Sequence, residues 1–84
     1  MSKGERLMRR LIRHLKMKDE LNDKLIRGKL TDNPNEADWR YHLGYSIGYN
    51  DGKITEIEDR IDELNDPNFT VEKVHEHYNM EKEL

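Results

Sequence analysis

Residues 39–64 read WRYHLGYSIGYNDGKITEIEDRIDEL, and the periodicity of this stretch decides the fold class. In its first half, aromatic and aliphatic residues alternate with polar residues or glycine as far as Asn50-Asp51-Gly52, a pattern typical of a strand that enters a hairpin. The second strand of such a hairpin is missing. The apolar residues that follow recur at three- and four-residue spacing, which places them on one face only in a helix: Ile54, Ile57, Ile61 and Leu64.

A single helix over residues 34–64 explains both halves of this stretch. Its apolar face extends back from the isoleucines through Asn50 to Leu43 without a change of register. Residues 33–36 (NPNE) offer an N-cap residue, a proline at the first helical position and a glutamate at the third. Three interior glycines cost such a helix about 1 kcal/mol each relative to alanine, which indicates that they serve a purpose.

Two further helices flank the central one. Residues 4–28 carry apolar side chains at helical spacing and end in Gly28, a residue that commonly terminates a helix. Residues 65–68 (NDPN) break the central helix. A short third helix then spans residues 70–81, with Thr70 as its cap.

We therefore predict one all-α domain over residues 1–84, an antiparallel hairpin of two long helices with the short third helix folded back. In the third helix we expect Phe69 to pack on Val74, beside a narrow stripe that Val71 and Tyr78 complete. The residues expected in the core between the long helices are Leu7, Leu11, Leu15, Leu25, Leu43, Ile47, Ile54, Ile57 and Ile61.

The composition indicates that this core is small. Eighteen of the 84 residues are Leu, Ile, Val or Phe, 39% of the chain is charged, and there is no cysteine. So short a chain usually gains stability from disulfides, a metal or another subunit, and the lack of cysteine excludes disulfides and thiolate metal sites. We therefore expect a homodimer or a higher homo-oligomer, with no cofactor.

Charge is distributed unevenly. Residues 1–30 carry a net charge of +6 and the rest of the chain −9, which sum to the overall −3. The basic side chains of the first helix could follow the phosphates of DNA or RNA, lie on an anionic membrane surface, or form a solvated face that the acidic helix complements. Those opposite its leucines are Arg6, Arg9, Arg10, Arg13 and Lys16.

The central helix carries two rows that lie away from its isoleucine face. The glycines recur every four residues and allow close approach to the backbone, while the tyrosines beside them offer flat hydrogen-bonding surface. The rows could pack inside the chain, bind a partner or a second copy, or line a small-molecule pocket. Their members are Gly44, Gly48 and Gly52, and Tyr41, Tyr45 and Tyr49.

An acidic run follows these rows. It could be a soluble surface, or it could imitate nucleic acid and occupy a basic groove in another protein. Its members are Glu56, Glu58, Asp59, Asp62, Glu63 and Asp66.

Motifs for catalysis are missing from the sequence. His75 and His77 are two residues apart, which puts their rings on different sides of a helix, so we expect no metal site. The chain has no cysteine nucleophile, no Gly-x-Ser-x-Gly and no phosphate loop, so we expect no enzyme. There is no apolar run of 18 residues and no secretory signal pattern, and we expect a cytoplasmic protein.

The segment from Leu43 to Ile54, LGYSIGYNDGKI, together with residues 56–61 (EIEDRI), resembles a recurring pattern in short accessory proteins of bacteriophages of Gram-positive bacteria. The resemblance implies an all-helical, oligomeric, non-catalytic inhibitor or adaptor that binds a host or defence protein, in the host cytoplasm.

The function hypothesis that combines these features is a protein-binding module. It would use the Gly and Tyr rows together with the acidic residues Glu56, Asp59, Asp62 and Glu63. An alternative is a nucleic-acid-binding protein that uses the basic first helix. A third is a sponge for a small anionic ligand such as a nucleotide, held by the Tyr row and by basic side chains of a neighbouring subunit.

Overall fold

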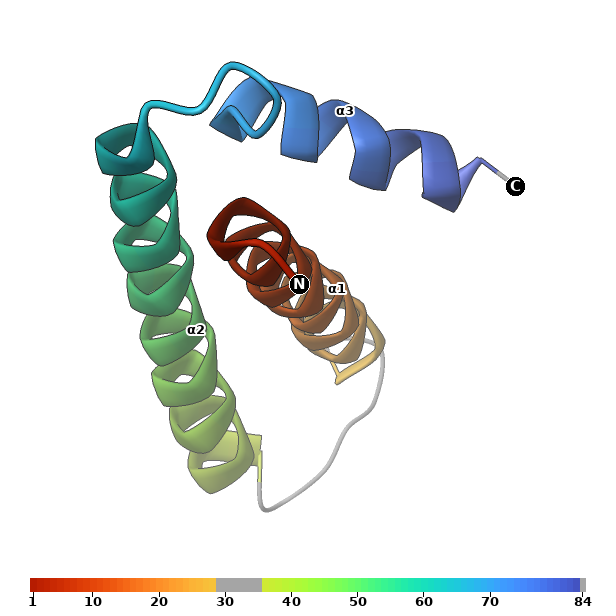
Figure 1. Cartoon of the computed structure of the whole chain (residues 1–84). Coiled ribbons are helices and arrows are strands. Elements are labelled where there is room, and N and C mark those ends of the chain that lie inside the picture. Colours follow the sequence, from red (N-terminus) through yellow and green to blue (C-terminus); the bar gives the residue numbers. More distant parts are fainter. Residues whose placement is uncertain (29–35, 84) are drawn as a thin grey trace.

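The computed structural model describes residues 1–28 and 36–83, which form three α-helices (Figure 1). These are α1 (Lys3–Gly28), α2 (Glu36–Leu64) and α3 (Val71–Lys82). The described ranges contain no strand, so the all-α prediction is confirmed and the alternating pattern before Gly52 is helical. The predicted start of the second helix, residues 34 and 35, lies outside these ranges. In the described part of the chain, no helix has an apolar stretch long enough to span a membrane.

The two long helices pack against each other and run antiparallel. Leu7 near the start of α1 and Leu64 at the end of α2 line one groove, and His14 faces Asn50 further along. Asn50 is buried and donates through Nδ2 to the His14 carbonyl at 3.0 Å, while its Oδ1 lies 2.7 Å from His14 Nδ1. A buried amide is stable only where such partners are present, so this pair fixes the register of the helices.

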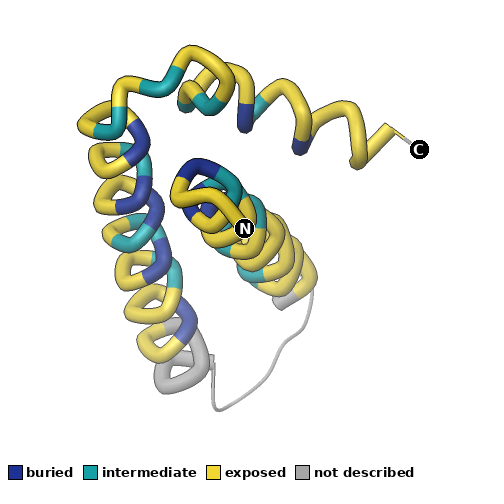
Figure 2. Tube along the Cα trace, in the orientation of Figure 1, coloured by how far each residue is buried: buried dark blue, intermediate teal, exposed yellow. Residues whose placement is uncertain are grey.

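The core lies where α1, α2 and α3 meet. Figure 2 shows the buried residues on the facing sides of the two long helices and on two turns of α3. Leu43 is buried apart from this cluster. The predictions for Leu25 and Ile47 were wrong: both are half-buried, because they lie outside the cluster that α3 completes. The cluster consists of Leu7, Leu11, Leu15, Ile54, Ile57, Ile61, Val74 and Tyr78.

The connection from α2 to α3 follows the local sequence. Asn65 has φ of 52°, a left-handed conformation that asparagine tolerates and that ends a helix. Thr70 caps α3 as predicted, because its hydroxyl accepts from the Lys73 backbone N–H at 3.2 Å. The ring of Phe69 lies against Gly4 of α1, where an added Cβ would stand only 2.8 Å from the ring Cγ. Because Gly4 has no side chain, the loop before α3 can pack directly against α1 at this position.

Polar contacts hold α3 to both long helices. The Tyr78 hydroxyl donates to Asp19 Oδ2, and Lys82 Nζ lies 2.9 Å from the same oxygen. His75 Nε2 lies 3.2 Å from Glu58 Oε2 on α2. The hydrogen bonds from Lys82 and Tyr78 lower the pKa of Asp19, and burial together with the Asp19 carboxylate raises the pKa of Tyr78 to about 12.

Candidate protein-binding surface

The Gly/Tyr face of α2, defined as Tyr41, Gly44, Tyr45, Gly48, Tyr49 and Gly52, lies in solvent. Tyr41, Tyr45 and Tyr49 are 72%, 71% and 61% exposed. A tyrosine that contributes to a core buries most of its ring, and these three bury less than half. The three rings therefore contribute little to the packing of the chain itself.

The glycines of this face have open space in front of them. A Cβ built on Gly44, Gly48 or Gly52 would meet no atom within 4 Å, other than the neighbouring residues and the helix backbone. By contrast, Gly4 of α1 stands directly against Phe69. The interpretation that the glycine row packs against another helix of the same chain is therefore wrong among the described residues.

The acidic residues continue the Gly/Tyr face toward the end of α2. At about 100° per residue, Tyr45 points away from the side on which Leu43 and Ile47 lie, and the acidic residues begin on the outward side two turns after Tyr49. We call them the acidic flank, and all four are exposed: Glu56, Asp59, Asp62 and Glu63.

The acidic flank is only partly neutralised by its own helix. Glu56 lies 3.5 Å from Lys53 Nζ and 3.0 Å from Arg60 Nη2. No ion pair between described residues includes Asp59, Asp62 or Glu63. The outward side of α2 therefore consists of the Gly/Tyr face followed by three acidic side chains that have no ion-pair partner among the described residues.

Two of the tyrosine rings have neighbours that orient them. Lys53 Nζ stands 5.6 Å from the centre of the Tyr49 ring, within the range of a cation–π contact. Tyr41 meets His42 edge-on at 5.7 Å between ring centres. These contacts are local to α2, so the Gly/Tyr face is presented by the helix alone.

The basic face of α1 is also exposed. The acidic half of α2 lies beside α1, but the ion pair that the described residues form between the two helices is Lys18–Asp51 at 3.8 Å. No ion pair between described residues includes the five side chains of this face, Arg6, Arg9, Arg10, Arg13 and Lys16.

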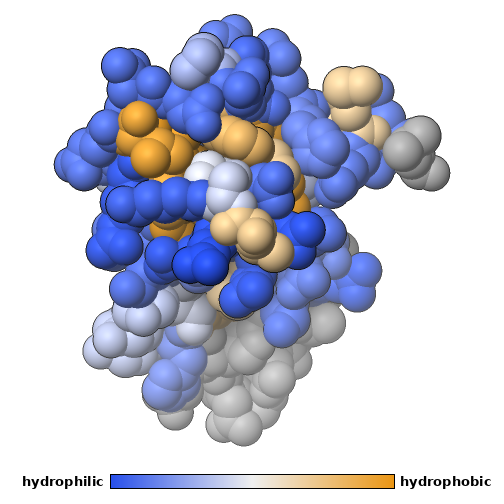
Figure 3. All heavy atoms as spheres, viewed as in Figure 1, coloured by the Kyte–Doolittle hydropathy of each residue, from blue (hydrophilic) through white to orange (hydrophobic). Residues whose placement is uncertain are grey.

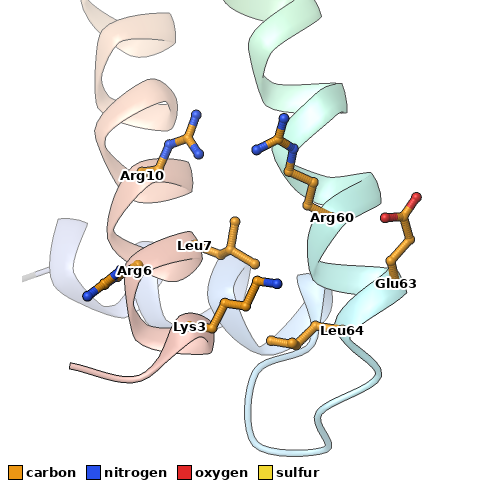
Figure 4. Close-up of a pocket in the computed structure, with 7 residues that line it drawn as sticks. All are labelled: Lys3, Arg6, Leu7, Arg10, Arg60, Glu63 and Leu64. Atoms are coloured by element: carbon orange, nitrogen blue, oxygen red, sulfur yellow. The ribbon is translucent and has the colours of Figure 1, made fainter.

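A groove opens between the start of α1 and the end of α2, with a volume of about 660 Å³. Figure 3 shows a mostly hydrophilic face with apolar patches gathered where the helices meet. The sequence placed Arg6 and Arg10 in the basic face, but Lys3 and Arg60 were not recognised as site residues. The antiparallel pairing of the helices, which sets residue 60 opposite residue 10, could have indicated them. The groove is lined by Lys3, Arg6, Leu7, Arg10, Arg60, Glu63 and Leu64 (Figure 4).

The described histidines make contacts within the chain. His14 bonds to Asn50, His75 lies beside Glu58, and His77 Nε2 lies 3.1 Å from Glu81 Oε1. Within residues 1–28 and 36–83, no three acidic or histidine side chains are grouped so that they could hold a metal ion.

Comparison of the chain with protein-family models, with curated proteins and with solved structures finds no match.

Proposed function

We propose that the chain is a non-enzymatic protein-binding module whose contact surface is the Gly/Tyr face of α2 with its acidic flank. The observation that carries the proposal is the exposure of all three tyrosines next to three glycines with open space in front of them. From the resemblance of this segment to phage accessory proteins, we further propose an inhibitor or adaptor that acts on a host or defence protein.

The chemistry of the surface defines the partner. Glycines at four-residue spacing leave a shallow track along α2 in which a partner helix or loop can approach the backbone, and rigid tyrosine rings beside it supply contact area at low entropic cost. Asp59, Asp62 and Glu63 favour basic side chains at one end of that track and speed the encounter. The partner we propose is a protein segment with a small-residue or apolar ridge next to lysine or arginine.

Site-specific photo-crosslinking in an extract of the host cell tests this proposal. A benzophenone amino acid replaces Tyr45, and a control chain carries it in place of His77, an exposed residue on α3. We expect one protein to crosslink from position 45 and not from position 77, and Gly48→Leu to abolish that product because the leucine side chain fills the track. The same products from both positions, or a product that Gly48→Leu leaves unchanged, would contradict the proposal.

We also propose that the chain forms a homo-oligomer. The basic face of α1 and the acidic flank of α2 both point outward, so the basic face of one copy can meet the acidic flank of another. Sedimentation at several protein concentrations should show a mass that rises with concentration at 50 mM salt and falls toward the monomer at 500 mM salt. A monomer mass at every concentration and salt would contradict this assembly.

Nucleic-acid binding is the second candidate. It is favoured by the exposure of the five basic side chains on α1 and by the absence of acidic partners for them among the described residues. A short duplex should bind with an affinity that falls steeply as salt rises, because each neutralised phosphate releases counterions. No gel shift at low salt would dismiss this candidate.

The sponge for a small anionic ligand remains a proposal that needs a second subunit. Tyr41, Tyr45 and Tyr49 face away from α1, so one chain cannot bring them together with its own basic face.

A further inference from the structure

The groove between α1 and α2 brings together basic side chains from both helices. In Figure 4 the side chains of Arg10 and Arg60 extend toward each other from the two helices, and Lys3 reaches toward α2 at the other end of the groove. The lining contains four basic side chains and one acid, Glu63, whose carboxylate turns away from Arg10 and Lys3. Two guanidinium groups directed at one gap repel each other unless an anion lies between them.

Neither Arg10 nor Lys3 takes part in an ion pair between described residues. Arg60 lies 3.0 Å from Glu56, but a guanidinium carries five N–H donors and one carboxylate leaves several of them available. The donors therefore come from both helices and are directed into one space.

The shape of the groove limits what can occupy it. Its volume of about 660 Å³ lies in the range of small-molecule sites, and its apolar lining is Leu7 and Leu64. Apolar walls strengthen the attraction between an anion and the cations at the rim, because they exclude water from one side. Each arginine can bind a phosphate group through two parallel hydrogen bonds, and a lysine adds a positive point charge.

We propose that this groove is a binding site for a small polyphosphate anion, held between Arg10 and Arg60 with Lys3 on its far phosphate. The site shares no residue with the Gly/Tyr face itself, although Glu63 of the acidic flank lies at its rim. A nucleoside triphosphate and inorganic polyphosphate present the same chemistry, and the apolar walls allow the nucleotide an additional contact through its base.

Calorimetric titration with ATP and with inorganic tripolyphosphate, in magnesium-free buffer at 150 mM salt, tests the proposal. The double variant Arg10→Gln with Arg60→Gln should raise the Kd about 100-fold, or about tenfold for each guanidinium that is removed. The matched control, Arg9→Gln with Arg13→Gln, removes the same amount of charge from α1 outside the groove and should change the Kd less than threefold.

Binding of both probes with equal affinity would support recognition of the phosphates alone, and tighter binding of ATP would add the base contact. Chemical shifts in the wild-type protein give a second measurement, because the backbone amides of Lys3, Arg10 and Arg60 should move most on addition of either probe. No binding of either probe by the wild-type chain, or an equal weakening of binding in the two double variants, would overturn the proposal.

Discussion

The two ends of the helix pair differ in what covers them. At the three-helix end, residues 4–19 of α1 and 53–64 of α2 meet α3, and Leu11, Ile57 and Val74 are almost entirely buried. In the two-helix arm, residues 20–28 of α1 and 36–49 of α2, no hydrogen bond or ion pair between described residues reaches α3, and Ile26 is 62% exposed. The contrast in burial is visible along the tube in Figure 2. Most of the core therefore lies at one end of the helix pair, while the other end presents a Gly/Tyr face that contributes little to folding.

The largest predicted effect is a difference in the loss of unfolding free energy when a leucine is truncated at each of the two ends. Leu11→Ala at the three-helix end should lower the free energy of unfolding by about 2–5 kcal/mol, because a fully buried leucine leaves a cavity. Leu25→Ala in the two-helix arm should cost about 1 kcal/mol, since that side chain is only half-buried. Urea denaturation measures both, and equal losses of stability would show that the two ends are packed alike.

The next effect concerns the contact between α1 and the loop before α3. Gly4→Ala should lower the free energy of unfolding by about 1–3 kcal/mol, because the new methyl group overlaps the Phe69 ring. Phe69→Leu supplies the control: in that background the added methyl group has more room, so Gly4→Ala should cost less. An equal cost in both backgrounds would indicate that Phe69 does not restrict this site.

A smaller effect depends on pH and involves the hydrogen bond from Tyr78 to Asp19. Tyr78→Phe should lower the free energy of unfolding by about 1 kcal/mol near pH 7, since it leaves Asp19 without this donor. The folded-state pKa of Tyr78 is raised to about 12, so its contribution is complete below the ordinary value near 10 and is lost as pH rises toward 12. The stability difference between the two proteins should therefore shrink from pH 10 upward. A difference that stays constant to pH 12 would contradict the raised pKa.

Much of the fold follows from periodicity in the sequence. The isoleucine spacing after Gly52 predicted α2, and the leucines of α1 predicted the side on which it packs. Thr70 predicted the start of α3, because capping depends on neighbouring residues alone. The strand-like alternation around Tyr45 did not change the prediction, since the sequence has no second strand to pair with it.

Other features could not be predicted, because they depend on how helices sit against each other. Leu25 and Ile47 are half-buried because of where α3 packs on the long helices. Phe69 lies against Gly4 because of the course of the loop before α3, which no local sequence pattern specifies. The groove likewise combines Lys3 and Arg60, which are far apart in sequence. The Gly/Tyr face was recognised from its spacing, but only the structure shows that it points outward.

The Gly/Tyr face is not used to fold the chain and is available for a partner. The decisive measurement is the free energy of unfolding of a chain with Gly44→Ala, Gly48→Ala and Gly52→Ala, at concentrations where the chain is monomeric. Alanine favours a helix by about 1 kcal/mol over glycine and meets open space at all three positions, so stability should rise by about 3 kcal/mol. A fall in stability would show that the glycines pack within the chain, and would contradict the account.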